Sequence, residues 1–145
     1  MAPNTKQTIE FLQHVPLFAD LNKRHLEVLA KRFVERAYAP GDVIVTQGLG
    51  GEGMFIVVSG QADAVRELHD GSKVVVNTFG STDFFGELAL LDDGLRTASV
   101  IAREQMTCLA LTRWDFLAEV RQDADMAVLI LQELARRFRQ ALDAM

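Results

Sequence analysis

The sequence predicts a mainly β fold, an antiparallel barrel or jelly roll, placed between two helical arms. All ten glycines of the 145-residue chain lie between Gly41 and Gly94, and glycine marks turns, whereas helix interiors avoid it. The same central region contains short runs of Val, Ile, Phe and Thr separated by Gly, Asp, Asn and Ser. Many short strands with no long helix between them are typical of antiparallel barrels.

The length and composition indicate one globular domain, 1–145, in which helices at 1–33 and 113–145 enclose a strand-rich centre at 34–112. The longest uncharged run is too short and too polar to cross a bilayer, and the N-terminus lacks the apolar core of a signal peptide. The single cysteine, Cys108, cannot form an internal disulfide. We therefore expect a cytoplasmic protein without a membrane span.

We expect seven strands in the centre. Asp70 and Gly71 are a signal for a two-residue hairpin loop between two of them. The stretch 86–91 contains helix formers and no β-branched residue, so it predicts a single helical turn between strands. The expected strands are 33–39, 43–46, 54–59, 62–68, 73–79, 97–102 and 106–112.

Capping residues predict the helices of both arms. Asn22 is a suitable N-cap for a helix that ends near Phe33. Thr112 followed by Asp115 resembles a capping box for a helix to about residue 121, and the last helix begins near Asp123. That last helix carries one predicted apolar stripe, formed by Ala127, Leu131, Leu134, Phe138 and Leu142.

Two features that suggest chemistry have simpler explanations. Residues 48–53 match the pattern G-x-G-x-x-G, but a strand follows them where a dinucleotide-binding fold requires a helix. We expect only a glycine-rich connection there. The three histidines, His14, His25 and His69, are scattered, so we expect neither a metal site nor a catalytic set of residues, and hence no enzyme.

The segment 83–91, followed by Arg96 and Thr97, is a better candidate for binding. Amides at the start of a short helix suit a phosphate. Glu87 can accept a hydrogen bond from a neutral hydroxyl such as that of a ribose, and the guanidinium of Arg96 offers a fork of donors for phosphate oxygens. An ion pair between Arg96 and Glu87 that only ties strand to helix is equally compatible with the sequence.

The other charges do not favour a second anion site or a nucleic-acid surface. Of the four basic residues between 41 and 111, Arg66 and Lys73 flank the hairpin loop and Arg103 lies in another turn, so we expect Arg96 alone to be placed to neutralise a phosphate. The net charge of −5 argues against direct nucleic-acid binding. The basic cluster at 136–139 is expected to be a solvated helix face.

Residues 85–91 followed by 96–98 resemble the phosphate-binding cassette of cyclic nucleotide-binding domains. These domains occur in the catabolite activator family, in regulatory subunits of cyclic nucleotide-dependent kinases and in cyclic nucleotide-gated channels. Residues 15–18, 40–44, 47–48 and 54–60 are also similar to that family. The resemblance implies an eight-stranded antiparallel β-roll of the jelly-roll type, with an internal cassette helix, N-terminal helices, and C-terminal hinge and lid helices.

The resemblance also implies a non-catalytic sensor that needs no cofactor and binds cAMP or, less favoured, cGMP. Glu87 would bind the ribose 2′-hydroxyl and Arg96 the cyclic phosphate, while Thr97 stands where many cAMP binders have alanine and a hydroxyl can favour cGMP. The complete set of implied ligand-binding residues is Phe85, Gly86, Glu87, Leu88, Ala89, Arg96, Thr97, Ala98, Val76, Leu134 and Phe138.

For the signal itself we expect the last helix to close over the base through Leu131, Leu134, Ala135 and Phe138, swinging about residues 116–123. Without ligand the same stripe could pair with a second copy, and an effector protein is the other possible partner. Two alternatives remain open. The chain could be the ligand-binding part of a catabolite-activator-type transcription regulator without its DNA-binding part, or, less favoured, a jelly-roll metal enzyme.

Overall fold

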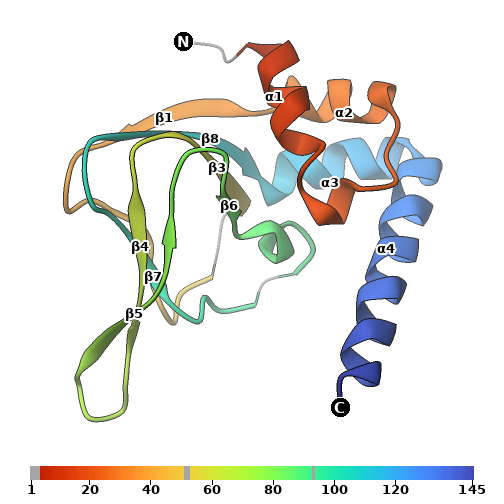
Figure 1. Ribbon diagram of the computed structural model, residues 1–145. Coiled ribbons are helices and arrows are strands. Elements are labelled where there is room, and N and C mark those ends of the chain that lie inside the picture. The colour runs from red at the N-terminus through yellow and green to blue at the C-terminus, as the bar shows by residue number, and fades with distance from the viewer. Residues whose placement is uncertain (1–3, 51–52, 93) are drawn as a thin grey trace.

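The computed structural model of the protein describes residues 4–50, 53–92 and 94–145, and within these ranges it has eight strands flanked by helices (Figure 1). The helical elements are α1 (Thr5–Leu12), η1 (Pro16–Phe18), α2 (Lys23–Ala30), the short 3-10 helix η2 (Glu87–Leu90), α3 (Arg113–Gln122) and α4 (Ala124–Asp143). The strands are β1 (Val34–Tyr38), β2 (Val43–Val45), β3 (Gly53–Ser59), β4 (Ala62–Glu67), β5 (Lys73–Phe79), β6 (Phe84–Phe85), β7 (Ser99–Ala102) and β8 (Met106–Thr112).

The strands form two antiparallel sheets, in the orders β1-β8-β3-β6 and β2-β7-β4-β5. The predicted antiparallel β-roll is therefore confirmed, with η2 between β6 and β7 in the chain. The eighth strand, β6, was not among the seven expected ones. Its two residues pair with β3, Phe85 opposite Phe55 and Phe84 opposite Ile56, and two residues are too few for an alternating pattern to be visible in the sequence.

Strand β3 separates two hydrophobic cores, which explains why it is apolar along most of its length. Met54 and Ile56 point toward the helices, where they pack with residues such as Phe18 and Phe116. Phe55 and Val57 alternate with them and face the interior of the roll. A strand buried on both faces has no polar side. One face of β3 packs against the helices, and the other lines the interior of the roll.

The predicted N-caps are confirmed. The side chain of Asn22 accepts from the backbone N–H of His25 at 2.9 Å, and His25 Nδ1 accepts from the N–H of Asn22 at 3.3 Å, which closes a capping box. Thr112 accepts from Asp115 N at 3.1 Å. Asp115 does not complete a second box, because its carboxylate accepts from Arg32 at 3.2 Å. Helix α2 ends at Ala30, earlier than expected.

The hairpin between β4 and β5 has a three-residue loop, not the predicted two-residue loop. Leu68 N donates to Ser72 O, and Gly71 N donates to Leu68 O. Gly71 has a φ of 87°, in the left-handed region that a loop of this kind requires at its last position. Asp70 accepts from both the amide and the hydroxyl of Ser72, and these hydrogen bonds lower the pKa of its carboxyl group.

Cys108 is a buried core residue of β8, as expected. Its side chain lies inside the roll with Val57 and Met106. Burial raises the pKa of the Cys108 thiol to about 11, because a thiolate loses its hydration there. The thiol is therefore protonated at neutral pH and is not a nucleophile.

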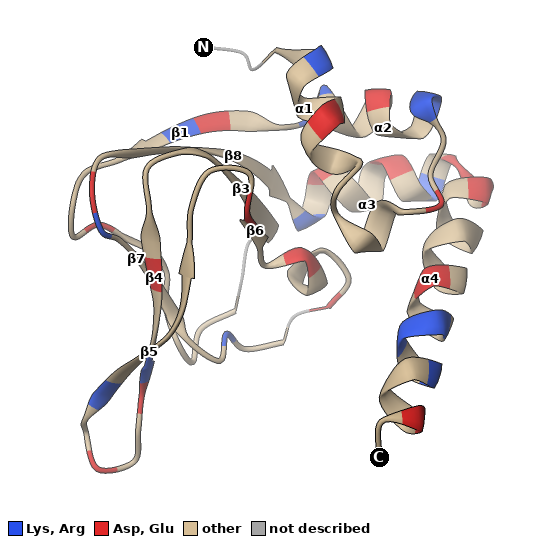
Figure 2. Ribbon diagram, viewed as in Figure 1, with Lys and Arg blue, Asp and Glu red and all other residues tan. Residues whose placement is uncertain are grey.

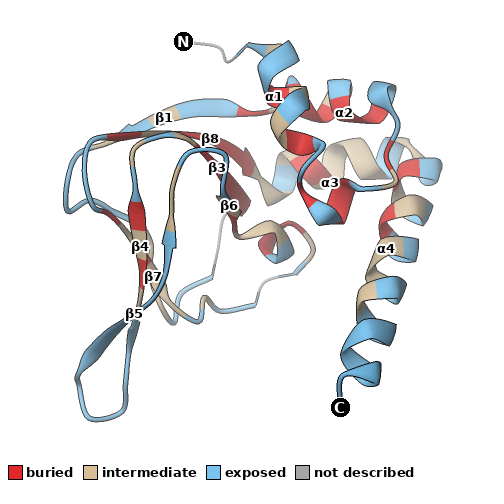
Figure 3. Cartoon of the chain, in the orientation of Figure 1, coloured by how far each residue is buried: buried red, intermediate tan, exposed pale blue. Residues whose placement is uncertain are grey.

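The expected single apolar stripe of α4 is divided between two faces. Met126 and Ile130 are buried, and Leu134 packs against the same core. Leu131, Phe138 and Leu142 are 63%, 66% and 50% exposed. Figure 3 shows this change along the helix, from buried residues near α3 to exposed ones toward the C-terminus. The helix leaves the body of the protein after its first turns, so nothing covers its distal apolar residues here.

Thr82 is under backbone strain, and replacing it with glycine should stabilise the fold. Its φ is 76°, a region that costs a β-branched residue about 1–2 kcal/mol. Its N–H donates to Val57 O at 2.8 Å, which holds the turn in place. We expect Thr82→Gly to raise the free energy of unfolding by up to about 1 kcal/mol, after the entropic cost of glycine is subtracted.

Thermal and denaturant unfolding measure this change, with Thr82→Ala as the matched control. Alanine removes the exposed hydroxyl and methyl groups but keeps the Cβ atom that causes the strain, so its stability should stay near that of the parent. Equal stability of the glycine and alanine variants would contradict the assignment of strain.

Candidate ligand-binding site

A short structural unit between the two sheets positions the candidate site. Strand β6 ends at Phe85, Gly86 is the N-cap of η2 with φ 82°, and η2 buries Ala89 and Leu90 against β3 and α3. The N-cap carries no side-chain hydrogen bond, so backbone amides at the start of η2 face the space in front of it. The chain then returns through Leu95 to Arg96 and β7.

Two adjoining cavities of about 380 Å³ and 360 Å³ meet at Gly86, Arg96 and Thr97. The first is also lined by Glu87, Leu88, Ala89, Asp92, Gly94 and Leu95. The second, inside the roll, is also lined by Val45, Ala64, Arg66, Val76, Asn77, Phe79, Phe85, Ala98 and Val100. Nine of the eleven predicted ligand-binding residues thus line one or both of these adjoining cavities.

The other two predicted residues, Leu134 and Phe138, do not line either cavity. Leu134 packs against the helical core and Phe138 is exposed on the distal part of α4. The structure therefore places the cassette residues together and leaves the lid residues away from them. A closing movement of α4 is needed before they could meet a ligand.

Residues of the glycine-rich segment orient Arg96 through hydrogen bonds. Its Nη2 donates to Gly53 O at 2.7 Å, its backbone N–H donates to Leu49 O, and its carbonyl accepts from Gly48 N, both at 2.9 Å. The pattern at 48–53 is a connection, as expected, and it also orients this arginine. Arg96 Nε is buried and has no hydrogen-bond partner among the residues that the structure describes.

The electrostatics of Arg96 favour an anion in the cavity. Burial lowers the pKa of Arg96, and the charge of Glu87 partly opposes that effect. A guanidinium keeps its proton at neutral pH even so, which leaves a desolvated positive charge with an unused donor. No ion pair joins Arg96 to Glu87 within the described ranges, so the alternative of a purely structural pair is not supported.

Gly86 is required where the cassette passes Arg96. A Cβ atom at this position would lie 2.5 Å from Arg96 Nη1 and 2.7 Å from Gly53 O. The positive φ also disfavours any side chain. The guanidinium can therefore reach the boundary between the cavities only beside a glycine.

A second central arginine lies at one of the cavities. Arg66, which was expected only beside the hairpin loop, lines the second cavity. Ala62 and Ala64 are buried inside the roll, and the alternation of β4 places Arg66 on that same face. This alternation is visible in the sequence, but the hairpin beside Arg66 suggested a purely exposed position. Val45, Ala64, Asn77, Phe79 and Val100 were also missed as lining residues.

The remaining charges are distributed over the surface. In Figure 2 the basic parts of α4 and of the β4–β5 hairpin have acidic residues near them along the chain. Within the described ranges no helix is both long and apolar enough to cross a membrane, and no group of three or more His, Cys, Asp or Glu is arranged to hold a metal ion. The absence of direct nucleic-acid binding stays a prediction.

The fold is thus a β-roll with two adjoining cavities that share a partly buried arginine. Residues 35–123 match the family model described as "Cyclic nucleotide-binding domain". This match covers more than half of the chain, so the protein belongs to the cyclic nucleotide-binding domain family. The family is a regulatory ligand-binding domain, not a catalytic one.

The relatives agree with this assignment. The chain is 36% identical over 126 residues to the Cyclic AMP receptor protein of Thermus thermophilus, covering 87% of this chain and 58% of the relative. It is 34% identical over 110 residues to a cGMP-dependent protein kinase of Drosophila melanogaster, covering 74% of this chain and 12% of the kinase. The chain therefore spans about half or less of the length of these curated relatives.

A solved structure, the N-terminal domain of a transcriptional regulator from Streptomyces coelicolor A3(2), has the same fold. It aligns with a TM-score of 0.85 at 31% identity, over 93% of this chain and 96% of that one. The overall similarity therefore shows the family and the fold, and the choice of nucleotide must be argued from the site.

Replacing Gly86 should disturb both the fold and the position of Arg96. We expect Gly86→Ala to destabilise the protein by about 1–2 kcal/mol from the left-handed backbone alone, with a further loss from the contact with Arg96. Nucleotide affinity should fall because the guanidinium is displaced. Gly80→Ala is the matched control, since a Cβ atom there meets nothing within 4 Å. Unchanged affinity in Gly86→Ala would contradict the described packing.

Proposed function

We propose that the chain is a sensor for a cyclic nucleotide, cAMP in the first place. The observation that carries the proposal is the partly buried guanidinium of Arg96, whose Nε is unpaired among the described residues and which lines two adjoining cavities. A cyclic phosphate is a small monoanion whose oxygens suit the arginine fork. The similarity to the cAMP receptor protein supports cAMP as the first ligand to test.

The two cavities supply different surroundings for the two ends of such a ligand. Glu87 in the first cavity is an acceptor for the 2′-hydroxyl of a ribose. The second cavity has an apolar lining that includes Ala64, Val76 and Ala98, which suits the flat face of a purine. The phosphate would then lie at the shared boundary, next to Arg96.

The test of the binding proposal is Arg96→Leu, which removes the charge that neutralises the phosphate. We expect the Kd for cAMP in isothermal titration to rise 100-fold or more, since truncating one partner of a buried charge pair costs about 2–5 kcal/mol. Glu87→Ala should cost less, about 1 kcal/mol, because a neutral hydroxyl is lost as a partner. Arg103→Leu is the control: that arginine contacts Gln61 and Asp63 away from both cavities. An Arg96→Leu variant that binds within a few-fold of the parent would refute the proposal.

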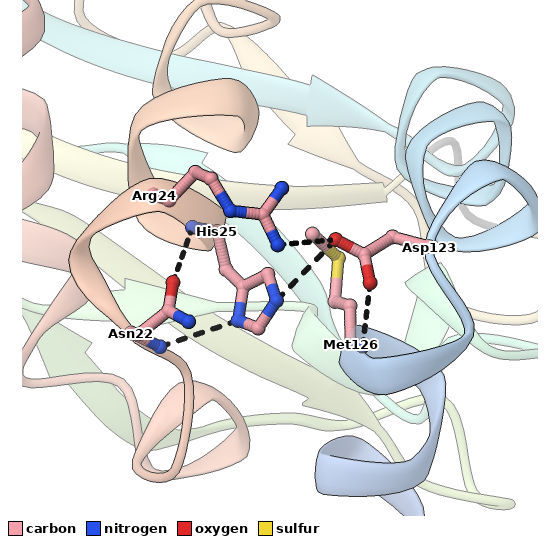
Figure 4. Close-up of polar contacts among 5 residues, drawn as sticks. All are labelled: Asn22, Arg24, His25, Asp123 and Met126. Carbon is pink, nitrogen blue, oxygen red and sulfur yellow. Dashed lines mark hydrogen bonds and ion pairs between the residues drawn. The ribbon is translucent and has the colours of Figure 1, made fainter.

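We further propose that α4 reports the bound state by closing over the base. This proposal is supported by a difference along α4. Hydrogen bonds and ion pairs hold its N-terminal end at the junction with α3, whereas Phe138 and Leu142 near its C-terminal end are exposed. One oxygen of Asp123 accepts from Met126 N at 3.2 Å, and the other lies 3.3 Å from both Arg24 and His25 of α2 (Figure 4). The hydrogen bond from Met126, followed by the charges of His25 and Arg24, lowers the pKa of Asp123.

An exposed face along α4 offers the apolar surface that such a movement requires. Val128, Leu131, Phe138 and Leu142 are all at least 48% exposed. Their spacing of three, seven and four residues, with Ala135 between Leu131 and Phe138, is also that of a coiled-coil seam. Pairing with a second copy is therefore the competing use of this face in the absence of ligand.

Hydrogen exchange decides whether α4 responds. We expect amides from 125 to 142 to exchange more slowly after cAMP is added, together with those of 86–91, since a closed helix is held at both ends. The parent and Arg96→Leu should be compared at equal cAMP concentration, the variant serving as the unliganded control. Protection confined to 86–91 would leave a binder without this switch. Sedimentation at several concentrations separates closure from dimer formation.

A second proposal concerns the whole protein. The close structural match to the N-terminal domain of a transcriptional regulator supports a role as the ligand-binding part of such a regulator. A kinase-type attachment is supported in the same way by the cGMP-dependent kinase. The sequence of the complete gene distinguishes them.

A further inference from the structure

Arg66 is an exposed arginine that lines the second cavity, and the binding scheme above does not use it. Strand β4 pairs with β7, Ala62 opposite Ala102 and Ala64 opposite Val100, and these four residues are buried inside the roll. Arg66 is next on the same face and lines the second cavity together with Arg96. None of the described residues that line this cavity is Asp or Glu.

The position of Arg66 is held by two sets of hydrogen bonds. Its Nε donates to the carbonyl of Thr97 at 3.3 Å, directly after Arg96 in the chain. The side-chain amide of Gln47 braces the next residue of β4, since its Oε1 accepts from Glu67 N at 2.7 Å and its Nε2 donates to Glu67 O at 3.1 Å. The end of β4 is thus fixed relative to the cassette.

The terminal nitrogens of Arg66 remain free to meet a ligand. Within the described ranges no carboxylate lies within 4 Å of its guanidinium, and its hydrogen bond to Thr97 uses only Nε. A guanidinium is a donor at all five of its N–H groups and never an acceptor. Arg66 can therefore donate to acceptor atoms of a ligand that enters the second cavity.

The part of the ligand that lies in this cavity follows from the proposed function, on which this inference rests. With the phosphate beside Arg96 and the ribose beside Glu87, the purine is the part left for the second cavity. Its apolar walls cover the faces of the base, while Arg66 and Asn77 are the polar groups that β4 and β5 add to the lining. A base edge is thus the group that Arg66 meets.

We propose that Arg66 donates to the O6 and N7 edge of guanine, so that the cavity accepts cGMP in addition to cAMP. Guanine presents two adjacent acceptors on this edge, whereas adenine presents one acceptor and an amino donor. Two parallel hydrogen bonds from one guanidinium fit the first pattern and not the second. Arg66 is then a specificity-determining residue of the site.

Isothermal titration of the parent, Arg66→Leu and Arg66→Lys with cAMP and cGMP tests the assignment. The parent should bind both nucleotides within about ten-fold of each other. Arg66→Leu should weaken cGMP binding roughly 10- to 100-fold, the range of one two-donor contact to guanine, and change cAMP binding by less than about three-fold. Arg66→Lys should be intermediate, because an ammonium lacks the planar fork. Arg103→Leu is the control. It replaces an arginine that is not among the residues lining either cavity, so it should change neither the cAMP nor the cGMP affinity.

Cyclic inosine 3′,5′-monophosphate separates the O6 edge from the 2-amino group. It keeps O6 and N7 of guanine and lacks the 2-amino group, so Arg66→Leu should weaken its binding as much as that of cGMP. Unchanged affinity for this nucleotide in Arg66→Leu, beside a loss for cGMP, overturns the inference.

The outcomes for the two proposals are separate. Equal losses of cAMP and cGMP affinity in Arg66→Leu would show a contact to the shared phosphate or ribose, and no loss of either would show no contact. Both results overturn the role of Arg66 and leave cyclic nucleotide binding intact. Failure of the parent to bind any cyclic nucleotide overturns both proposals.

Discussion

Arg96 reaches the boundary of the two cavities because no side chain stands at Gly86 or Gly53. A Cβ atom on Gly86 would meet the guanidinium itself, and one on Gly53 would lie 1.9 Å from Leu111 O, which would force β3 away from β8. Gly53 also supplies the carbonyl that orients Arg96. The charge that a ligand must neutralise is therefore positioned by backbone packing, and the cassette, the glycine-rich connection and the central strand pair all depend on that packing.

The helices form a single support for the cassette side of the roll. Phe18 and Phe116 pack with ring centroids 6.2 Å apart, and Arg32 joins α2 to α3 through Glu119 at 2.9 Å. Arg136 also contacts Asp20, beyond η1. Ion pairs that solvent reaches contribute only about 0–1 kcal/mol each. Burial of the aromatic side chains therefore contributes most to the packing of these helices. Helix α4 shares this support as far as Arg136, and beyond it Phe138 and Leu142 are exposed.

This division bears on how a binding signal could leave the domain. The cassette helix η2 packs between β3 and α3. A shift of η2 would therefore displace α3 and, through Asp123 at the N-cap of α4, the start of that helix. The exposed distal part of α4 has few contacts to lose, and so its position costs little to change. A ligand needs only a modest difference in affinity for two positions of such a helix to shift their populations.

Local chemistry by itself determined much of this protein. The caps at Asn22, Thr112 and Asp123 could be predicted because each depends on residues close in the chain. The eight-stranded roll and half of the cavity lining followed from the resemblance of the cassette to a known family. Three features required the tertiary structure. Strand β6 exists only through its pairing with β3, the stripe of α4 is divided by where the helical core ends, and Arg66 enters the cavity because β4 lies beside β7. In each case segments far apart in sequence decide which side of a residue is buried, and no local pattern contains that information.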